Sequence, residues 1–239
     1  GNRLQQLPAS LANCHRLELI RLAANQLHTL PDWLLALPSL SWLAYAGNPL
    51  HEDASASPND DDTPNLDWSQ LALEQQLGEG ASGIIYQAQW NAPSQPARSV
   101  AVKLYKGNIT SDGSPLNEMN ACIAAGQHPN LIKVLGRVVN HPNQQAGLVM
   151  ELIAPSFSNL AALPSFDSCS RDVYADSTRF TTDSALRIAR GIASAAGHLH
   201  AQGICHGDVY GHNILFNAQG DCLLGDFGAA CFHAIDDSP

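Results

Sequence analysis

His206-Gly207-Asp208-Val209-Tyr210-Gly211-His212-Asn213 is followed further along the chain by Asp226-Phe227-Gly228. Two short apolar runs lie between these stretches, at residues 214–216 and 222–224, and the polar residues 217–221 separate the runs. Short apolar runs on either side of a polar turn predict a β-hairpin. We expect the two quoted stretches to lie at opposite ends of that hairpin.

Three side chains in these stretches have the chemistry of magnesium-assisted phosphoryl transfer. The carboxylate of Asp208 is suited to orienting an attacking hydroxyl, because it can accept a hydrogen bond from it. Asn213 and Asp226 offer oxygen ligands of the kind that hold Mg²⁺ against phosphate oxygens. Two unrelated acidic loops beside a hairpin are the alternative interpretation.

A glycine-rich loop comes earlier in the chain, with Gly78, Gly80 and Gly83 in the sequence Gly-Glu-Gly-Ala-Ser-Gly. Glycines let the backbone approach a phosphate closely, with amide groups free to donate. The same spacing occurs in dinucleotide-binding folds, where a helix follows. Here the apolar residues 84–90 predict a strand instead. A second strand, Val100-Ala101-Val102-Lys103, ends in a lysine.

A helix is predicted after this second strand. Ser114 is a suitable N-cap, Pro115 fits the first helical position, and Gly126 ends the helix. Glu118 lies in the first turn, where the helix dipole favours a carboxylate. An exposed glutamate with no special role is the alternative.

Together, these motifs resemble those of the eukaryotic-like Ser/Thr protein kinases of bacteria. The resemblance covers residues 66–239 and implies an α+β bilobal domain, with an N-lobe at 66–153 and an incomplete C-lobe at 154–239. It also implies ATP and Mg²⁺ as cofactors and Ser/Thr hydroxyls of proteins as acceptors.

The resemblance assigns a role to individual residues. Asp208, Lys103 and Asn213 would be catalytic, and Asn213 and Asp226 would hold the metal. Glu118 would form an ion pair with Lys103, which reaches the ATP phosphates. The ATP-binding set would be Gly78, Gly80, Gly83, Ile85, Ala101, Lys103, Glu118, Glu151, Ile153 and Leu215.

The resemblance extends to the connection between the two lobes. The turn at residues 128–132, His-Pro-Asn-Leu-Ile, is similar to the one that opens the fourth strand of protein kinases. Met150 would be the gatekeeper, and the backbone of Glu151 and Ile153 would meet the adenine. Backbone contacts leave no signature in the side chains, so ordinary strand residues are the alternative here.

Two positions depart from the family pattern. Gly207 stands where many kinases carry an arginine that docks an activation-loop phosphate. Tyr210 stands where Ser/Thr kinases place a lysine against the transferring phosphate. Loss of such a cation costs on the order of 10²-fold in rate unless His212 or Tyr210 replaces it. The chain also resembles a fragment, because the Ala-Pro-Glu motif and the later helices of the family do not follow Phe232.

Two other functions compete with protein phosphorylation. The form His-Gly-Asp-x-x-x-x-Asn also occurs in aminoglycoside and choline kinases, which act on small molecules. A pseudokinase or scaffold is the non-enzymatic alternative, because Tyr210 replaces a cation. The glycine-rich loop and the lysine strand favour a protein kinase.

Residues 1–50 contain a 23-residue repeat, in which Asn2, Asn25 and Asn48 align and leucines recur around them. The pattern resembles the leucine-rich repeat, an α/β repeat whose asparagines satisfy backbone groups in the turns. The repeats are expected to dock a protein substrate or regulator. The alternative is that they pack on the upper lobe and stabilise it. Residues 51–65 are acidic and lack an apolar face, which indicates a linker.

The rest of the C-terminal half predicts few regular elements. Residues 158–163 are expected to form a short helix, and residues 164–182 to be irregular. Thr182 or Asp183 is expected to cap a helix that runs to about residue 201.

Composition excludes several classes of protein. A net charge of −10, without a cluster of Lys and Arg, argues against a nucleic-acid partner. No apolar run is long enough to span a membrane. Six cysteines without a Cys-x-x-Cys spacing indicate reduced thiols. We therefore expect a cytoplasmic protein.

Overall fold

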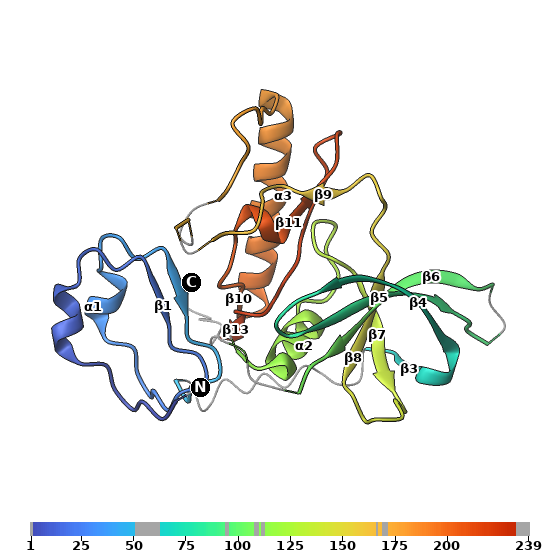
Figure 1. Cartoon of the computed structure of the whole chain (residues 1–239), viewed down its shortest axis with the longest axis horizontal. Helices are drawn as coiled ribbons and strands as arrows, with labels where there is room; N and C mark the ends of the chain where they lie inside the picture. Colours follow the sequence, from blue (N-terminus) through green and yellow to red (C-terminus); the bar gives the residue numbers. More distant parts are fainter. Residues whose placement is uncertain are drawn as a thin grey trace.

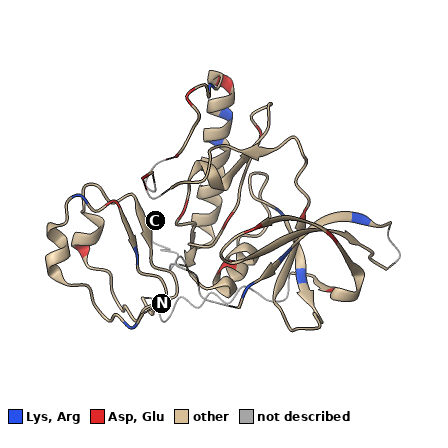
Figure 2. Cartoon of the chain, in the orientation of Figure 1, with Lys and Arg blue, Asp and Glu red and all other residues tan. Residues whose placement is uncertain are grey.

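A computed structural model describes residues 2–50, 63–93, 96–107, 110, 113–165, 167–168 and 172–232. The expected linker therefore lies almost wholly outside the described residues. The part of the chain that the structure describes contains no helix both long and apolar enough to cross a membrane. Lys and Arg are scattered over these residues, as Figure 2 shows, and form no basic stripe.

Six strands form one twisted sheet, in the order β3-β7-β8-β6-β5-β4 (Figure 1). All neighbours are antiparallel except β3 and β7. Buried valines on the inner strands, with leucines around them, form the core of the sheet. The strands are β3 (Asn65–Asp67), β4 (Leu71–Glu79), β5 (Gly83–Trp90), β6 (Arg98–Tyr105), β7 (Val134–Val139) and β8 (Gly147–Glu151). The first strand was not expected, and it begins one residue before the predicted boundary of the domain.

Helix α2 (Pro115–Ala124) packs against this sheet, where Met119 and Ile123 contact Tyr105 and Leu148. The predicted cap is confirmed, because the Ser114 side chain accepts a hydrogen bond from the Leu116 amide. The helix thereby brings its first turn, with Glu118, beneath the end of β6.

The second lobe is built around helix α3 (Thr182–Ala201), whose apolar face packs on two short strand pairs. Its cap lies one residue earlier than expected, because the Thr181 hydroxyl accepts from the Ser184 amide. The remaining elements are β9 (Ser158–Asn159), β10 (Ile204–Cys205), the 3-10 helix η3 (Gly211–Asn213), β11 (Ile214–Phe216), β12 (Cys222–Leu224) and β13 (Cys231–Phe232).

The expected short helix at 158–163 is wrong. Residues Ser158 and Asn159 form strand β9, which pairs with Phe216 and Leu215 of β11. The available edge of β11 satisfies the backbone groups of this segment, and a single helical turn would leave most of them unpaired.

The β11–β12 hairpin forms as predicted, but the position of its two flanking loops was predicted wrongly. Ile214 pairs with Leu224, so the start of one strand faces the end of the other. The amide of Gly225 donates to the Asn213 carbonyl over 3.0 Å. Both loops therefore meet at the open end of the hairpin, and only the turn at 217–221 lies at the opposite end.

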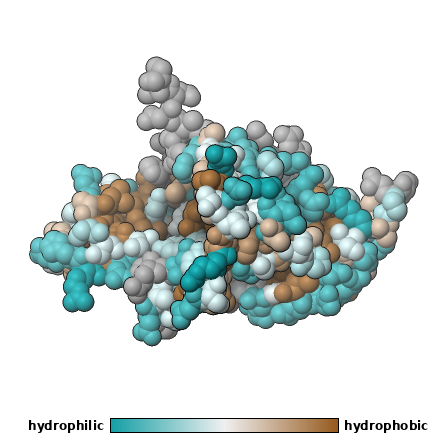
Figure 3. Space-filling view, turned by 90° about the horizontal axis from the view of Figure 1, so that it is seen from above, coloured by the Kyte–Doolittle hydropathy of each residue, from teal (hydrophilic) through white to brown (hydrophobic). Residues whose placement is uncertain are grey.

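The repeat segment, residues 2–50, contains the 3-10 helix η1 (Ala9–Asn13), strand β1 (Leu19–Arg21), helix α1 (Asp32–Leu35) and strand β2 (Trp42–Ala44). Leu19 pairs with Trp42 in a parallel register, which matches the 23-residue spacing of the sequence. Buried leucines fill the space between strands and helices. Figure 3 shows apolar side chains also reaching its surface (brown, left). Leu4 and Leu35 are exposed leucines of this segment.

Asn25 and Asn48 bond to the backbone, as the resemblance to the leucine-rich repeats implied. The Asn48 side chain accepts from the Leu27 amide and donates to the carbonyls of Leu22 and Tyr45. Assignment of the segment to the leucine-rich repeats stays a prediction.

The segment lies beside β10 and β13 (Figure 1).

Candidate active site

The glycine-rich loop is the turn between β4 and β5, closed by a hydrogen bond from the Gly80 amide to the Gly83 carbonyl. A Cβ atom at Gly78 or Gly80 would meet nothing within 4 Å, so the loop is open to solvent on the side of these two positions. A Cβ atom at Gly83 would lie 2.6 Å from the Leu104 carbonyl oxygen. Gly83 is therefore required where the two strands come closest.

Lys103 of β6 and Glu118 of α2 form the expected ion pair. Burial lowers the pKa of the Lys103 ammonium, but the charge and hydrogen bond of Glu118, with smaller contributions from Asp226 and Cys122, together raise the pKa above its usual value. Glu118 is only 2% exposed, and its second oxygen has no hydrogen-bond partner among the described residues. Lys103 thus stays protonated in a partly dry site, where its charge acts strongly on a phosphate.

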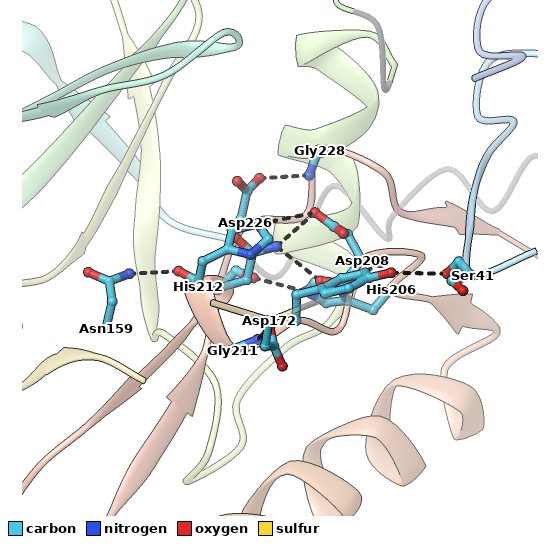
Figure 4. Close-up of polar contacts among 12 residues, drawn as sticks. Ser41, Asn159, Asp172, His206, Asp208, Gly211, His212, Asp226 and Gly228 are labelled. Carbon is cyan, nitrogen blue, oxygen red and sulfur yellow. Dashed lines mark hydrogen bonds and ion pairs between the residues drawn. The ribbon is translucent and has the colours of Figure 1, made fainter. Parts of the chain in front are cut away.

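Asp208 and Asn213 are joined directly. The Asn213 amide nitrogen donates to the Asp208 carboxylate over 2.8 Å and to its carbonyl over 3.0 Å. The amide oxygen of Asn213 is thereby turned away from Asp208. His212 Nε2 lies 4.0 Å from the same carboxylate, and Figure 4 shows this group with Asp226 and Gly228 above it.

Asp226 lies next to this pair because the hairpin returns the chain to its open end. It adopts a left-handed backbone with φ 57°, and its carboxylate accepts from the Gly228 amide over 3.1 Å. The buried His206 ring packs on Phe227 and donates to the Gly225 carbonyl over 2.9 Å. Burial lowers the pKa of His206, despite opposing effects of that carbonyl and of Asp226. A neutral imidazole therefore connects the loop at 206–213 to the segment at 225–228.

The structure explains why position 207 is a glycine, which the sequence did not reveal. Its φ is +77°, and a Cβ atom there would lie 2.4 Å from the Ala229 carbonyl oxygen. The loop carrying Asp208 and the segment after Gly228 touch at this point. An arginine at this position, as many kinases have, is incompatible with that contact.

One cleft of about 390 Å³ brings most of the predicted residues together. It is lined by the glycine-rich loop, by Lys103 and by residues on both sides of the hairpin's open end. The predicted residues on its wall are Gly78, Gly80, Gly83, Ile85, Lys103, Asn213, Leu215 and Asp226.

Five predicted residues do not line this cleft. Asp208 lies next to the wall, where its carboxylate accepts a hydrogen bond from the side chain of Asn213. Glu118 lies behind Lys103, and Ala101 is buried within the sheet, at 6% exposure. The side chains of Glu151 and Ile153 line a separate hollow of about 330 Å³. This is compatible with a role for their backbone only, which stays a prediction.

Two residues that hold the loop at 206–213 in place were not predicted from the sequence. Asp172 accepts from the Gly211 amide over 2.6 Å, and Asn159 donates to the His212 carbonyl over 2.6 Å. Both lie in stretches without a motif, and Asp172 falls in the part predicted to be irregular. No pattern in the sequence marked them, because each acts on the backbone of a distant loop.

The comparison with protein families decides the class. The family described as protein tyrosine and serine/threonine kinase matches residues 71–238. The chain belongs to the protein kinase family. The match covers strands β4 to β8 of the sheet, α2, α3 and the hairpin, and leaves out strand β3 and the repeat segment.

The relatives of this kinase chain include both Ser/Thr and Tyr classes. Ephrin type-B receptor 4 of Mus musculus is 29% identical over 169 residues, which are 70% of this chain and 16% of the receptor. The serine/threonine-protein kinase mos of Gallus gallus is 28% identical over 181 residues, which are 70% of this chain and 49% of mos. The mos protein of Sus scrofa is 26% identical. The chain thus spans about half or less of the length of these relatives.

The donor set fits the cofactors that protein kinases generally use. Asp226 and Asn213 provide hard oxygen ligands on the wall of the cleft, and Mg²⁺ needs only one or two such groups beside water and phosphate. Within the described residues, no group of three His, Cys, Asp or Glu could hold a metal alone. The metal site would therefore be completed by the nucleotide.

Proposed function

We propose that this kinase domain transfers the terminal phosphoryl group of ATP to Ser/Thr hydroxyls of proteins. One observation carries the proposal: a single cleft is lined by the glycine-rich loop, Lys103, Asn213 and Asp226. Bound Mg²⁺ would neutralise charge on the phosphates. The two mos relatives, which are named as serine/threonine kinases, support this acceptor class.

Each residue of the site has a task that follows from its surroundings. Lys103, fixed by Glu118, would bind the phosphates by its charge. Asp208, held by the Asn213 amide, would orient the acceptor hydroxyl. Asn213 and Asp226 would hold the metal. The adenine would lie between Ile85 and Leu215, both on the cleft wall.

The proposal includes the parts of the chain outside the kinase match. We assign residues 1–50 to the leucine-rich repeats, as in bacterial kinases with such repeats, and a cytoplasmic location to the protein. The 23-residue register of β1 and β2 supports the repeat assignment. Leucine-rich repeats offer a strand face to protein partners.

Nucleotide binding and phosphoryl transfer by the full chain test the assignment. Lys103→Met should lower transfer to a Ser/Thr peptide by on the order of 10²-fold or more, because a preorganised cation is lost. Asp226→Asn should remove the effect of Mg²⁺ on ATP affinity. Lys133→Met is the matched control, since this lysine lies outside the cleft. Equal, metal-independent ATP affinity in the wild type and in Asp226→Asn would refute the proposal.

A catalytically weak scaffold is the second candidate, and one observation favours it. Tyr210 occupies the place of the usual lysine, and its side chain contacts the repeat segment instead of the cleft. This candidate predicts normal ATP binding with no transfer to peptides that contain Ser, Thr or Tyr. Transfer to an amino alcohol or aminoglycoside alone would indicate a small-molecule kinase.

A further inference from the structure

Tyr210, in the loop between Asp208 and Asn213, contacts the repeat segment. Its hydroxyl donates to the Ser41 carbonyl over 3.1 Å, the contact that reaches Ser41 at the edge of Figure 4. Its ring packs against Trp42 of β2, with 5.5 Å between ring centroids and an interplanar angle of 35°. Residues more than 160 positions apart are thus joined by a hydrogen bond and a ring contact.

Trp42 is buried by these contacts although it lies on a three-residue strand. It is only 6% exposed, and within the part of the chain that the structure describes its indole nitrogen has no hydrogen-bond partner. The guanidinium of Arg21, on the neighbouring strand β1, lies 4.9 Å from the ring centroid. The indole therefore contacts both the repeat segment's own arginine and the tyrosine of the loop. Such aromatic and cation contacts add to the energy of area burial.

A second contact lies beyond the loop. The Cys231 thiol of β13 donates to the Tyr45 hydroxyl over 3.1 Å. Cys231 pairs with Cys205 of β10, the residue directly before the loop that carries Asp208. Burial raises the pKa of Tyr45, with smaller contributions from Cys231 and Cys205, so its hydroxyl stays protonated in contact with the thiol.

A third contact reaches helix α2. A Cβ atom at Gly113, just before the helix, would lie 3.3 Å from the Ala46 methyl group and 2.9 Å from the Gly228 carbonyl oxygen. A Cβ atom at Gly47 would lie 3.7 Å from the Asn117 side chain. The repeat segment thus touches the acceptor loop, the segment after Asp226-Phe227-Gly228, and the start of the helix that carries Glu118.

We propose that the strand face of the repeat segment binds the chain's own acceptor loop, with Tyr210 as its anchor, and thereby restricts access of the acceptor to Asp208. The amide of Tyr210 donates to the Asp208 carbonyl over 3.1 Å, so the anchor and the acceptor-orienting residue share one tight turn. The binding rests on the contacts alone, whereas the control of access rests also on the proposed function.

This assigns Tyr210 a task other than contact with phosphate. A lysine at this position could not form the ring contact with Trp42, so the substitution that removes a cation also creates the docking contact. The repeat face that was expected to recruit a partner is occupied by the chain itself. A protein that bound this face would have to displace Tyr210, and would then free the acceptor loop.

Hydrogen–deuterium exchange of the full chain tests the docking. Trp42→Ala should speed exchange of amides in residues 206–213 and 229–232 by about tenfold or more, because ring contact and buried area are both lost. Tyr210→Phe and Tyr45→Phe remove one hydroxyl each and should speed exchange of the same amides roughly two- to tenfold. Exchange in β4–β6 should not change. Leu35→Ala, at a residue 73% exposed on α1, is the control that should change nothing.

Exchange at wild-type rates in 206–213 for all three docking variants would overturn the docking, and this readout does not depend on catalysis. The two hydroxyl variants keep the test valid if Trp42→Ala disturbs the fold of the repeats. For control of access, Trp42→Ala and Tyr45→Phe should increase phosphorylation of a Ser/Thr peptide several-fold at unchanged ATP affinity. Faster exchange together with unchanged or reduced phosphorylation would overturn the control of access, and absence of ATP binding would overturn the proposed function instead.

Discussion

Gly207 lies at a contact between two chain segments that could not be recognised from the sequence. The family resemblance shows only that an arginine is missing there. The structure shows that the loop before Asp208 and the segment after Gly228 are so close that no Cβ atom fits between them. Local packing therefore excludes an arginine at this position. As a result, the loop has no arginine there that could bind a phosphate.

Gly207→Ala should destabilise the protein by about 1–3 kcal/mol, since the left-handed backbone and the Ala229 carbonyl both oppose a side chain. Gly126→Ala is a matched control, because Gly126 has a φ of +64° but nothing within 4 Å of its Cβ position. Urea unfolding should show the larger loss for Gly207→Ala. Equal losses would mean that the contact with Ala229 does not matter.

His206 predicts a pH dependence of stability. Its pKa in the folded state lies below the usual value for histidine of about 6.5, because burial disfavours the charged ring. The unfolded chain then binds more protons, so this contribution is complete above about pH 6.5 and is lost as pH falls toward the folded pKa. The free energy of unfolding should decrease between about pH 7 and pH 5.

His206→Gln should flatten that pH dependence, because glutamine can still donate to the Gly225 carbonyl but does not titrate. His128 also has a lowered pKa, from partial burial and from the charge of the neighbouring His198, so His128→Gln should flatten the curve as well. If the slope in the His206 variant equals that of the wild type, the neutral buried imidazole is the wrong description.

Among the elements, helix α3 contains two glycines in different surroundings. Gly197 is exposed, and a Cβ atom there would meet nothing. A Cβ atom at Gly191 would lie 2.5 Å from the Cys222 sulfur and 2.8 Å from the Asn130 amide nitrogen. The helix therefore approaches β12 and the turn at 128–132 most closely at Gly191.

Alanine at these two positions should have opposite effects. Gly197→Ala should stabilise by about 0.5–1 kcal/mol, from helix propensity alone. Gly191→Ala has the same propensity gain but should destabilise by about 1–3 kcal/mol through overpacking. Thermal unfolding of both variants checks this. A stabilised Gly191→Ala protein would show that α3 can move away from the hairpin without cost.

For the whole molecule, control by phosphorylation is expected to differ from that of many kinases. No guanidinium at position 207 is available to bind a phosphate on the activation segment. The activity of the protein should therefore be unchanged after phosphatase treatment, within about twofold. A comparison of phosphatase-treated and untreated protein with a generic peptide checks this. Loss of most of the activity would contradict it.

Local sequence patterns determined most of the elements around the site. Glycines and apolar runs predicted the β4–β5 turn, and Ser114 and Pro115 predicted the start of α2. The resemblance of the motifs to those of protein kinases implied the Lys103–Glu118 ion pair, which is present. These predictions succeeded because each depends on neighbours along the chain or on a complete set of family motifs. The short segment at 158–163 carried no such signal and was predicted wrongly.

The sequence by itself determined which residues have the chemistry for phosphoryl transfer, and that a 23-residue repeat precedes them. Only the tertiary structure decided that both loops lie at one end of the hairpin, that Gly207 faces the Ala229 carbonyl, and that Tyr210 packs on Trp42. The physical reason is the range of the interactions. Caps, turns and strand periodicity arise between near neighbours, whereas these contacts join surfaces distant in the chain, and whether two surfaces fit depends on the packing of all the elements between them.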